Sequence, residues 1–137
     1  MIALDTNAIV RVLTEDDETQ ARTVRAIITD AEQKGVKILI LSEVIIETVW
    51  VLESAYQCAR DEIASLIENL LSAPAFFLPD SLVIRKAIKQ YKNSGDFADL
   101  LIVGQAKKHQ AAKLISFDKK LQKLFPDFVS EGSQNAR

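Results

Sequence analysis

Short apolar runs alternate with longer amphipathic stretches along the whole chain, and this alternation limits the folds available to it. Four runs have the length of buried strands: Ile2–Leu4, Ile38–Leu41, Phe76–Leu78 and Lys113–Ser116. The stretches between them carry apolar residues at helical spacing. Strands that alternate with helices predict parallel pairing, and nearly all-apolar strands predict a sheet covered on both faces. The pattern therefore predicts an α/β fold with a mostly parallel sheet flanked by helices.

Capping and stop signals delimit the expected helices. The stretch Asp17–Lys34 places its apolar residues on one stripe, and Gly35 follows it as a stop. Ser42 is expected to cap a helix that runs to about Glu53. Four more helices are expected, over Asp61–Leu71, from Asp80 or Ser81 to Tyr91, over Phe97–His109 and over Asp118–Leu124.

The composition is typical of one globular domain. The chain has 137 residues, of which 48% are hydrophobic and 26% charged. We expect a single domain over residues 1–130 and a flexible tail over residues 131–137. There is no signal-peptide pattern and no apolar run long enough for a bilayer. The single cysteine, Cys58, has no partner for an internal disulfide, so we expect a cytoplasmic protein.

The net charge of −2 conceals an uneven distribution. Residues 1–84 carry 6 basic and 14 acidic side chains, whereas residues 85–137 carry 11 basic and 5 acidic ones. The C-terminal part is therefore basic enough to hold phosphates. A solvated, lysine-rich helical surface explains the same numbers, and charge alone does not decide between the two interpretations.

Acidic residues follow the ends of three predicted strands. Asp5 comes directly after Ile2–Leu4, Glu43 and Glu47 follow the second run, and Asp118 follows the last. In open α/β sheets, functional sites form beyond the carboxyl ends of the strands. Glu43 and Glu47 are four residues apart on one helix, so spacing leaves open which of them faces a site.

Two further acids, Asp96 and Asp99, begin a predicted helix three residues apart, on one face. Taken singly, each acid has a simple structural explanation: Asp5 fits an Asx turn, and Asp96 and Asp118 fit helix N-caps. Taken together, they predict a cluster of carboxylates if the strands are neighbours.

Crowded carboxylates repel each other unless a cation joins them. A hard divalent ion with oxygen ligands is expected, which points to Mg²⁺, with Mn²⁺ as the alternative. One cysteine and one histidine, His109, are too few for a typical zinc site. Such a site suits hydrolysis of a phosphodiester. The chain has no GxxxxGK[ST] loop, which argues against an NTPase.

The sequence resembles the PIN-domain nucleases and, within them, the VapC-type toxins of type II toxin–antitoxin modules. The resemblance rests on four stretches that occur in order and span nearly the whole chain. They are LDTNAIVRVLTEDD at Leu4–Asp17, IIETVWVLESAY at Ile45–Tyr56, GDFADLLIVGQAKK at Gly95–Lys108 and LISFDKKLQKL at Leu114–Leu124. It implies a PIN-like fold with a central, mostly parallel sheet of four to five strands.

The resemblance also assigns the acids. The E-x-V-W-V-L pattern selects Glu47, the A-D-x-L-I pattern makes Asp99 the main ligand in its pair, and Asp96 becomes an accessory acid. Asp118 matches the family's last acid, with Ser116 in place of the usual threonine. The implied catalytic set and the side chains that support it are Asp5, Glu47, Asp96, Asp99 and Asp118, with Thr6, Asn7 and Ser116 in support.

The implied function is an Mg²⁺-dependent endoribonuclease in which Asp5, Asp99, Asp118 and Glu47 hold the metal. Glu47 and Asp96 are expected to order or deprotonate the attacking water. The implied partners are single-stranded RNA, a small antitoxin and a second copy of the chain. Three alternatives remain: a PIN-like RNA-processing nuclease without an antitoxin, a non-catalytic interaction module and a phosphotransfer receiver domain. A receiver domain would need a partner lysine directly after a late strand, whereas here the lysines follow Asp118 on a predicted helix.

Overall fold

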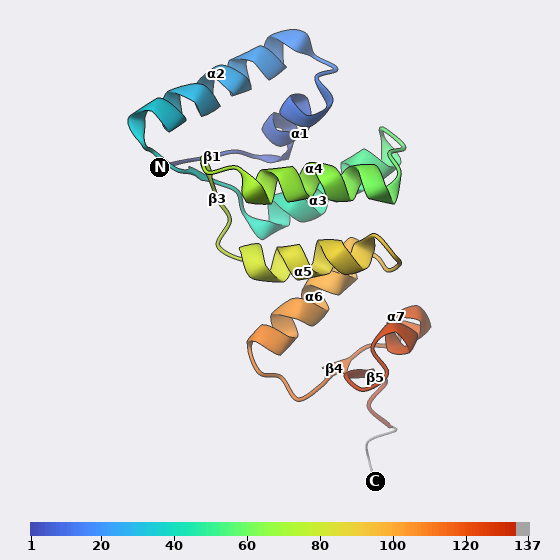
Figure 1. The fold of residues 1–137 in the computed structure, drawn as a ribbon. Helices are drawn as coiled ribbons and strands as arrows, with labels where there is room; N and C mark the ends of the chain where they lie inside the picture. Colours follow the sequence, from blue (N-terminus) through green and yellow to red (C-terminus); the bar gives the residue numbers. More distant parts are fainter. Residues whose placement is uncertain (134–137) are drawn as a thin grey trace. The chain divides into compact units, whose positions relative to one another are not determined.

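A computed structural model describes residues 1–133 of the chain (Figure 1). These residues divide into two compact units, one over residues 1–81 and one that begins at Leu82. Each unit has its own small parallel sheet. The single domain expected over residues 1–130 stays a prediction. Of the tail expected over residues 131–137, residues 134–137 lie outside the described residues.

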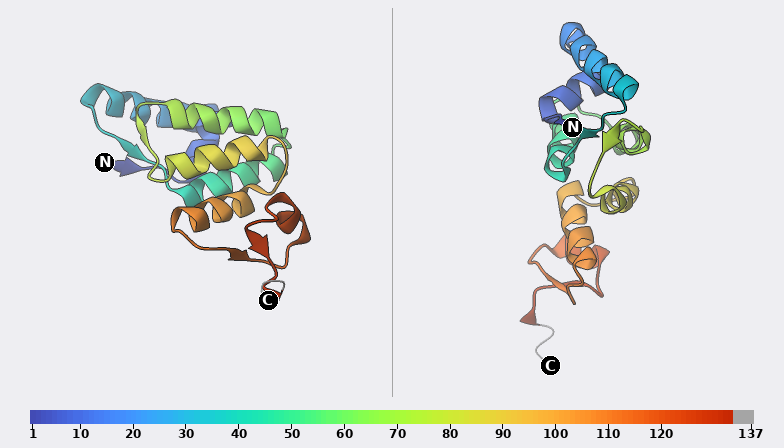
Figure 2. Two further views of the ribbon diagram at one scale, coloured as in Figure 1. Left: turned by 60° about the horizontal axis from the view of Figure 1, so that its bottom comes forward. Right: turned by 90° about the vertical axis from the view of Figure 1, so that its left-hand side faces the viewer.

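The first unit is a three-stranded parallel sheet with four helices (Figure 2). The strands pair in the order β1-β2-β3, with Ile2 opposite Ile38 and Ile38 opposite Phe76. Helix α1 packs against α2 and α3, and α3 packs against α4. The elements are β1 Ile2–Ala3, α1 Thr6–Thr14, α2 Glu18–Lys34, β2 Ile38–Leu39, α3 Ser42–Ser54, α4 Arg60–Ser72 and β3 Phe76–Phe77.

Local signals set the bounds of α2 as the sequence predicts. The Asp17 carboxylate accepts a hydrogen bond from the Gln20 amide at 3.0 Å and caps the helix. At the other end Gly35 adopts a φ of +67°, a left-handed conformation that glycine reaches at little cost.

One sequence expectation for this unit is wrong, and one helix was not predicted. Helix α3 has Leu41 as its N-cap without a side-chain hydrogen bond, and Ser42 is already its first helical residue. Helix α1 was not predicted. Its residues Ile9 and Val10 are β-branched, which gives them low helix propensity. Both of these side chains are buried, so packing outweighs their local preference.

The loop between α1 and α2 is fixed by a polar contact with the chain that follows α3. The Tyr56 hydroxyl donates a hydrogen bond to the Asp16 carboxylate, and the Arg11 guanidinium lies 3.4 Å from the same residue. The hydrogen bond from Tyr56 is the main cause that lowers the pKa of Asp16, and Thr14 and Arg11 add to it.

The second unit contains most of α5 together with two more helices and two strands, along the basic part of the chain. A cluster of Val103, Leu121 and Val129 forms its core, against which Leu114, Phe125 and Phe128 pack. The strands pair in parallel, with Leu114 opposite Val129. The elements are α5 Ser81–Tyr91, α6 Phe97–Lys108, β4 Leu114–Ile115, α7 Lys119–Leu124 and β5 Val129–Ser130.

The α/β class and the parallel pairing of the strands are confirmed. A single sheet of four to five strands was expected. In the described residues the five strands instead form one three-stranded and one two-stranded sheet. Strand β5 was not expected. It lies after Pro126 and has only two residues, which is too short for an alternating apolar pattern to be recognised in the sequence. No helix in the described part of the chain has both the length and the hydropathy to cross a membrane.

Helices α5 and α6 approach closely at Gly104. A Cβ added there would lie 2.7 Å from Cγ1 of Val83, nearer than real Cβ contacts allow. Glycine inside a helix lowers the stability of the folded state by about 1 kcal/mol relative to alanine. The space that Gly104 leaves for the Val83 side chain explains why a glycine occurs here.

We expect Gly104→Ala to lower the free energy of unfolding by about 1 kcal/mol, because overpacking outweighs the gain in helix propensity. In the double variant Val83→Ala/Gly104→Ala the clash is absent. A thermal-unfolding cycle of the wild type, both single variants and the double variant should therefore show a favourable coupling of about 1–2 kcal/mol. Additive effects would show that this contact does not limit the packing of α5 on α6.

Candidate active site

Asp5 lies between β1 and α1 and begins the helix. Its Oδ1 atom accepts a hydrogen bond from the Ala8 amide at 3.1 Å, as an N-cap does. No other hydrogen bond to this carboxylate occurs in the described residues, so its second oxygen is available. The bond comes from the Ala8 backbone rather than from the side chains of Thr6 or Asn7, which we expected to orient Asp5.

Glu43 and Glu47 both lie exposed on α3, but their surroundings differ. The Glu43 carboxylate accepts a hydrogen bond from the Ser42 hydroxyl at 3.1 Å, in the first turn of the helix. An acid in this position also interacts favourably with the helix dipole. Glu47 forms no hydrogen bond or ion pair within residues 1–133. The difference favours Glu47 as the acid that is available for chemistry.

Asp96 and Asp99 form the start of α6. Oδ2 of Asp96 accepts a hydrogen bond from the Asp99 amide at 3.1 Å, which makes Asp96 the N-cap. Gly95 precedes it with a φ of +104°, and a Cβ there would lie 3.1 Å from the Leu100 side chain. Glycine therefore allows the chain to enter the helix with both acids in its first turn.

Asp118 caps α7 in the same way. Its Oδ1 atom accepts hydrogen bonds from the amides of Lys120 and Leu121 at 2.9 and 3.2 Å. The Asp118 amide in turn donates to the Ser116 hydroxyl at 3.2 Å. The hydroxyl at position 116 thus fixes the turn between β4 and the capping acid.

The electrostatic environment of Asp99 connects the acids of the second unit. Partial burial is the largest cause that raises the pKa of Asp99, and the negative charges of Asp96 and Asp118 raise it further. Asp99 is therefore close enough to both neighbours for their charges to act on it. A bound cation would offset this repulsion, because it stabilises the ionised form of all three groups.

The donors are of the right chemical type for a hard divalent cation, since Asp5, Asp96 and Asp118 each use one oxygen for capping and keep the other. In the described part of the chain, however, no group of three or more Asp, Glu, His or Cys side chains is arranged so that it can hold one ion. Asp5 and Glu47 belong to the first unit, and the other three acids belong to the second. The five-acid cluster thus stays a prediction.

The comparisons with known proteins identify the family. The PIN domain family matches residues 2–124, which is most of the chain. The chain belongs to the PIN domain family. It is also similar to a protein described as VapC ribonuclease from Aquifex aeolicus (strain VF5), with 34% identity over 125 residues that cover 90% of this chain and 92% of that protein. No solved structure matches the chain significantly.

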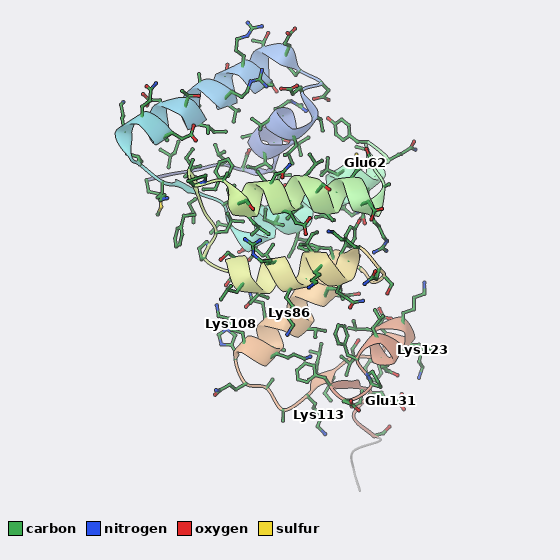
Figure 3. The ribbon with its side chains drawn as sticks, viewed as in Figure 1. Glu62, Lys86, Lys108, Lys113, Lys123 and Glu131 are labelled. Atoms are coloured by element: carbon green, nitrogen blue, oxygen red, sulfur yellow. The ribbon has the colours of Figure 1, made fainter. Side chains whose placement is uncertain are left out.

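Sequence reasoning missed two features of this PIN domain. Gly95 is needed for the backbone ahead of Asp96, and its only signal was its place before a helix cap. The basic residues of the C-terminal part were expected to hold phosphates, but the sequence did not indicate where its lysines lie. Figure 3 shows the side chains of Lys86, Lys108, Lys113 and Lys123 on the second unit.

The raised pKa of Asp99 predicts a stabilising substitution. Because the native state binds this proton more tightly than the unfolded state, ionised Asp99 costs stability at neutral pH. We expect Asp99→Asn to raise the melting temperature at pH 7–8 in EDTA. The advantage should shrink as the pH falls through the raised pKa and should vanish below about 3.8, where Asp99 is protonated in both states.

Thermal unfolding between pH 3 and pH 8 measures this difference. Asp61→Asn is the matched control, because Asp61 is an exposed acid in the first turn of α4. Its neutralisation removes a favourable interaction with the helix dipole and should not raise the melting temperature. A lower melting temperature for Asp99→Asn at pH 7 would contradict the electrostatic assignment.

Proposed function

We propose that this protein is an Mg²⁺-dependent endoribonuclease that hydrolyses phosphodiester bonds of cytoplasmic RNA, and that it acts as the toxin of a toxin–antitoxin pair. The observation that carries the proposal is the electrostatic crowding of Asp99 by Asp96 and Asp118 in a PIN domain. Like charges that destabilise a protein are retained where a substrate or cation uses them. The similarity to a VapC ribonuclease over nearly the full length of both chains supports RNA as the substrate.

Asp5, Asp99, Asp118 and Glu47 would hold the metal ion, either directly or through water. When bound, Mg²⁺ supplies positive charge against the scissile phosphate and the departing oxygen. Mn²⁺ offers the same chemistry with the same oxygen donors. The capping bonds of Asp5 and Asp118 fix the orientation of these carboxylates before any ligand arrives.

Glu47 and Asp96 would act on the attacking water. A carboxylate that orders this water also accepts its proton as the oxygen attacks phosphorus and the phosphorus–oxygen bond to the leaving group breaks. Glu47 suits this role because its carboxylate is exposed and forms no hydrogen bond or ion pair in the described residues. Single-stranded RNA is the preferred substrate, since its unstacked bases leave the backbone accessible.

We expect Asp5→Asn, Glu47→Gln and Asp99→Asn each to reduce Mg²⁺-dependent cleavage of a fluorescent single-stranded RNA by about 100-fold or more. Glu43→Gln is the matched control on the same helix and should cleave at close to the wild-type rate. Asp99→Asn is expected to be the more stable protein, so that its loss of activity cannot come from unfolding. Cleavage by Asp99→Asn at the wild-type rate would overturn the assignment.

Helix α3 also offers a surface for a partner. Four apolar residues on α3 and just after it could belong either to the core or to an interface: Val49, Trp50, Leu52 and Tyr56. Val49 and Leu52 are buried, whereas Trp50 is 65% exposed. An exposed tryptophan is a typical centre of a protein interface. We propose that the surface around Trp50 forms a homodimer, and that the antitoxin covers the site formed by the acids.

The dimer predicts a concentration-dependent change in mass. We expect Trp50→Ala to raise the dissociation constant at least about tenfold in sedimentation equilibrium, because tryptophan anchors commonly cost 2 kcal/mol or more when truncated. Ile27→Ala removes an exposed side chain from α2 and is the control. A wild-type protein that stays monomeric at millimolar concentration would contradict this interface.

A further inference from the structure

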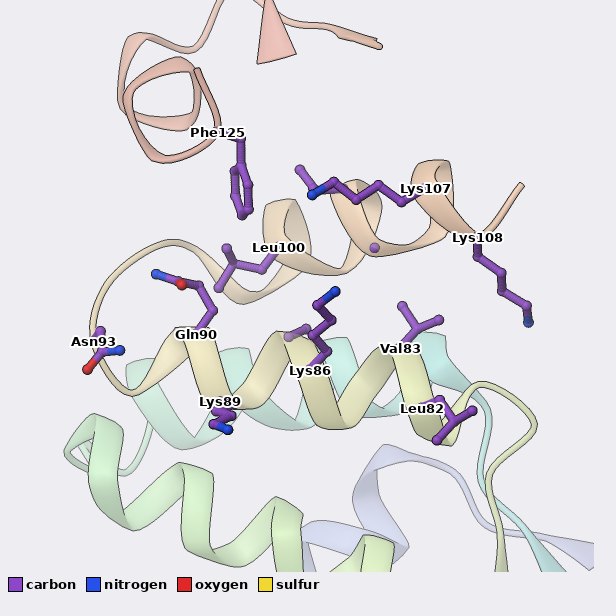
Figure 4. A pocket seen from close by; sticks show the side chains of 13 residues that line it. Leu82, Val83, Lys86, Lys89, Gln90, Asn93, Leu100, Lys107, Lys108 and Phe125 are labelled. Atoms are coloured by element: carbon purple, nitrogen blue, oxygen red, sulfur yellow. The ribbon is translucent and has the colours of Figure 1, made fainter. Parts of the chain in front are cut away.

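A groove between α5 and α6 lies within the second unit and is distinct from the acids at the helix starts. Its volume is about 600 Å³, and apolar side chains form most of its wall, among them Val83, Leu100, Val103 and Phe125 (Figure 4). The Phe125 side chain reaches into this space from the end of α7. We call this space the lysine groove.

Four lysines and no acidic residue line the lysine groove: Lys86 and Lys89 from α5, and Lys107 and Lys108 from α6. Figure 4 shows the Lys86 side chain reaching from α5 toward α6 and the Lys107 side chain running along α6 toward Phe125, whereas the Lys89 side chain points away from the groove. Neither Lys86 nor Lys107 forms an ion pair within residues 1–133. Two ammonium groups without an ion pair, one from each helix, are suited to an anionic occupant.

An aromatic ring and two amides accompany these cations. The Lys107 ammonium lies 5.3 Å from the centroid of the Phe125 ring and 5.1 Å from that of Phe128, so the rings hold it at the wall. Gln90 and Asn93 line the groove as well. Amide side chains donate and accept hydrogen bonds, as base edges require, and an aromatic ring offers a surface on which a base can stack.

The groove begins beside the proposed active site. Leu100 follows Asp99 directly and lies one turn after Asp96, and Leu100, Val103 and Lys107 lie on one stripe of α6. At 1.5 Å per residue, Lys107 is about 12 Å along the helix from Asp99. A strand held at the acids would therefore reach Lys107 within a few nucleotides.

We propose that the lysine groove binds single-stranded RNA adjacent to the scissile phosphate, with phosphates at Lys86 and Lys107 and a base against Phe125. The inference rests on the proposed ribonuclease function and extends it to the binding of the strand. The carboxylates of an acidic peptide would pair with the lysines and would have no use for an aromatic ring. The aromatic ring and the two amides favour a nucleotide.

The test measures binding rather than cleavage, in EDTA, with a fluorescently labelled ten-nucleotide RNA and anisotropy between 50 and 300 mM salt. Each phosphate contact on a single strand contributes about 0.7 to the slope of log K against log salt. We expect Lys86→Gln/Lys107→Gln to lower the magnitude of that slope by about 1.4 and to weaken binding at low salt by at least about tenfold. Arg22→Gln/Lys34→Gln carries the same charge change on the exposed face of α2 and should leave the slope unchanged.

A second variant separates stacking from charge. Phe125→Leu keeps an apolar side chain in the core but removes the ring, and it should weaken binding by about fivefold or more without changing the salt slope. An unchanged slope for the double lysine variant would overturn the proposal, as would binding of an acidic peptide in preference to the RNA. If the lysine variant lowers the slope as expected but the wild type does not cleave RNA with Mg²⁺, the nuclease proposal is refuted and the groove is not. If the wild type cleaves RNA and the lysine variant leaves the slope unchanged, only the groove is refuted.

Discussion

Helix N-capping by aspartate is the interaction on which the candidate site depends. Asp5, Asp96 and Asp118 each close the first turn of a helix with one carboxylate oxygen. This bond satisfies amides that the helix leaves unpaired and fixes the carboxylate at the helix start. The simple structural explanation and the functional one are therefore compatible, since an acid that caps with one oxygen still presents the other to a ligand.

The same arrangement of acids lowers the stability of the folded protein when no cation is bound. Asp99 stands in the first turn of α6, partly buried and facing the charges of two other acids, and its pKa is raised. Without a cation this repulsion opposes the folded state. A bound cation would offset this repulsion, and this is the reason why we propose Asp99 as a metal ligand.

Close packing of α5 on α6 gives the second unit a further surface. Gly104 lets Val83 approach α6, and the helices then leave between them a groove lined by lysines and apolar side chains. The basic half of the chain thus has a location for its charge, next to the helix that begins with Asp96 and Asp99. The net charge of the protein conceals this division.

The sequence by itself determined what depends on neighbouring residues. Helix α2 follows from Asp17 and Gly35, and the capping roles of Asp96 and Asp118 follow from their places before helices, because these interactions span only three or four residues. Tertiary structure decided the rest. Helix α1 forms because Ile9 and Val10 are buried, and the pKa of Asp99 is raised in part by Asp118, 19 residues away. The lysine groove likewise combines side chains from α5, α6 and the end of α7, and no local pattern records which residues of separate elements come to share one surface.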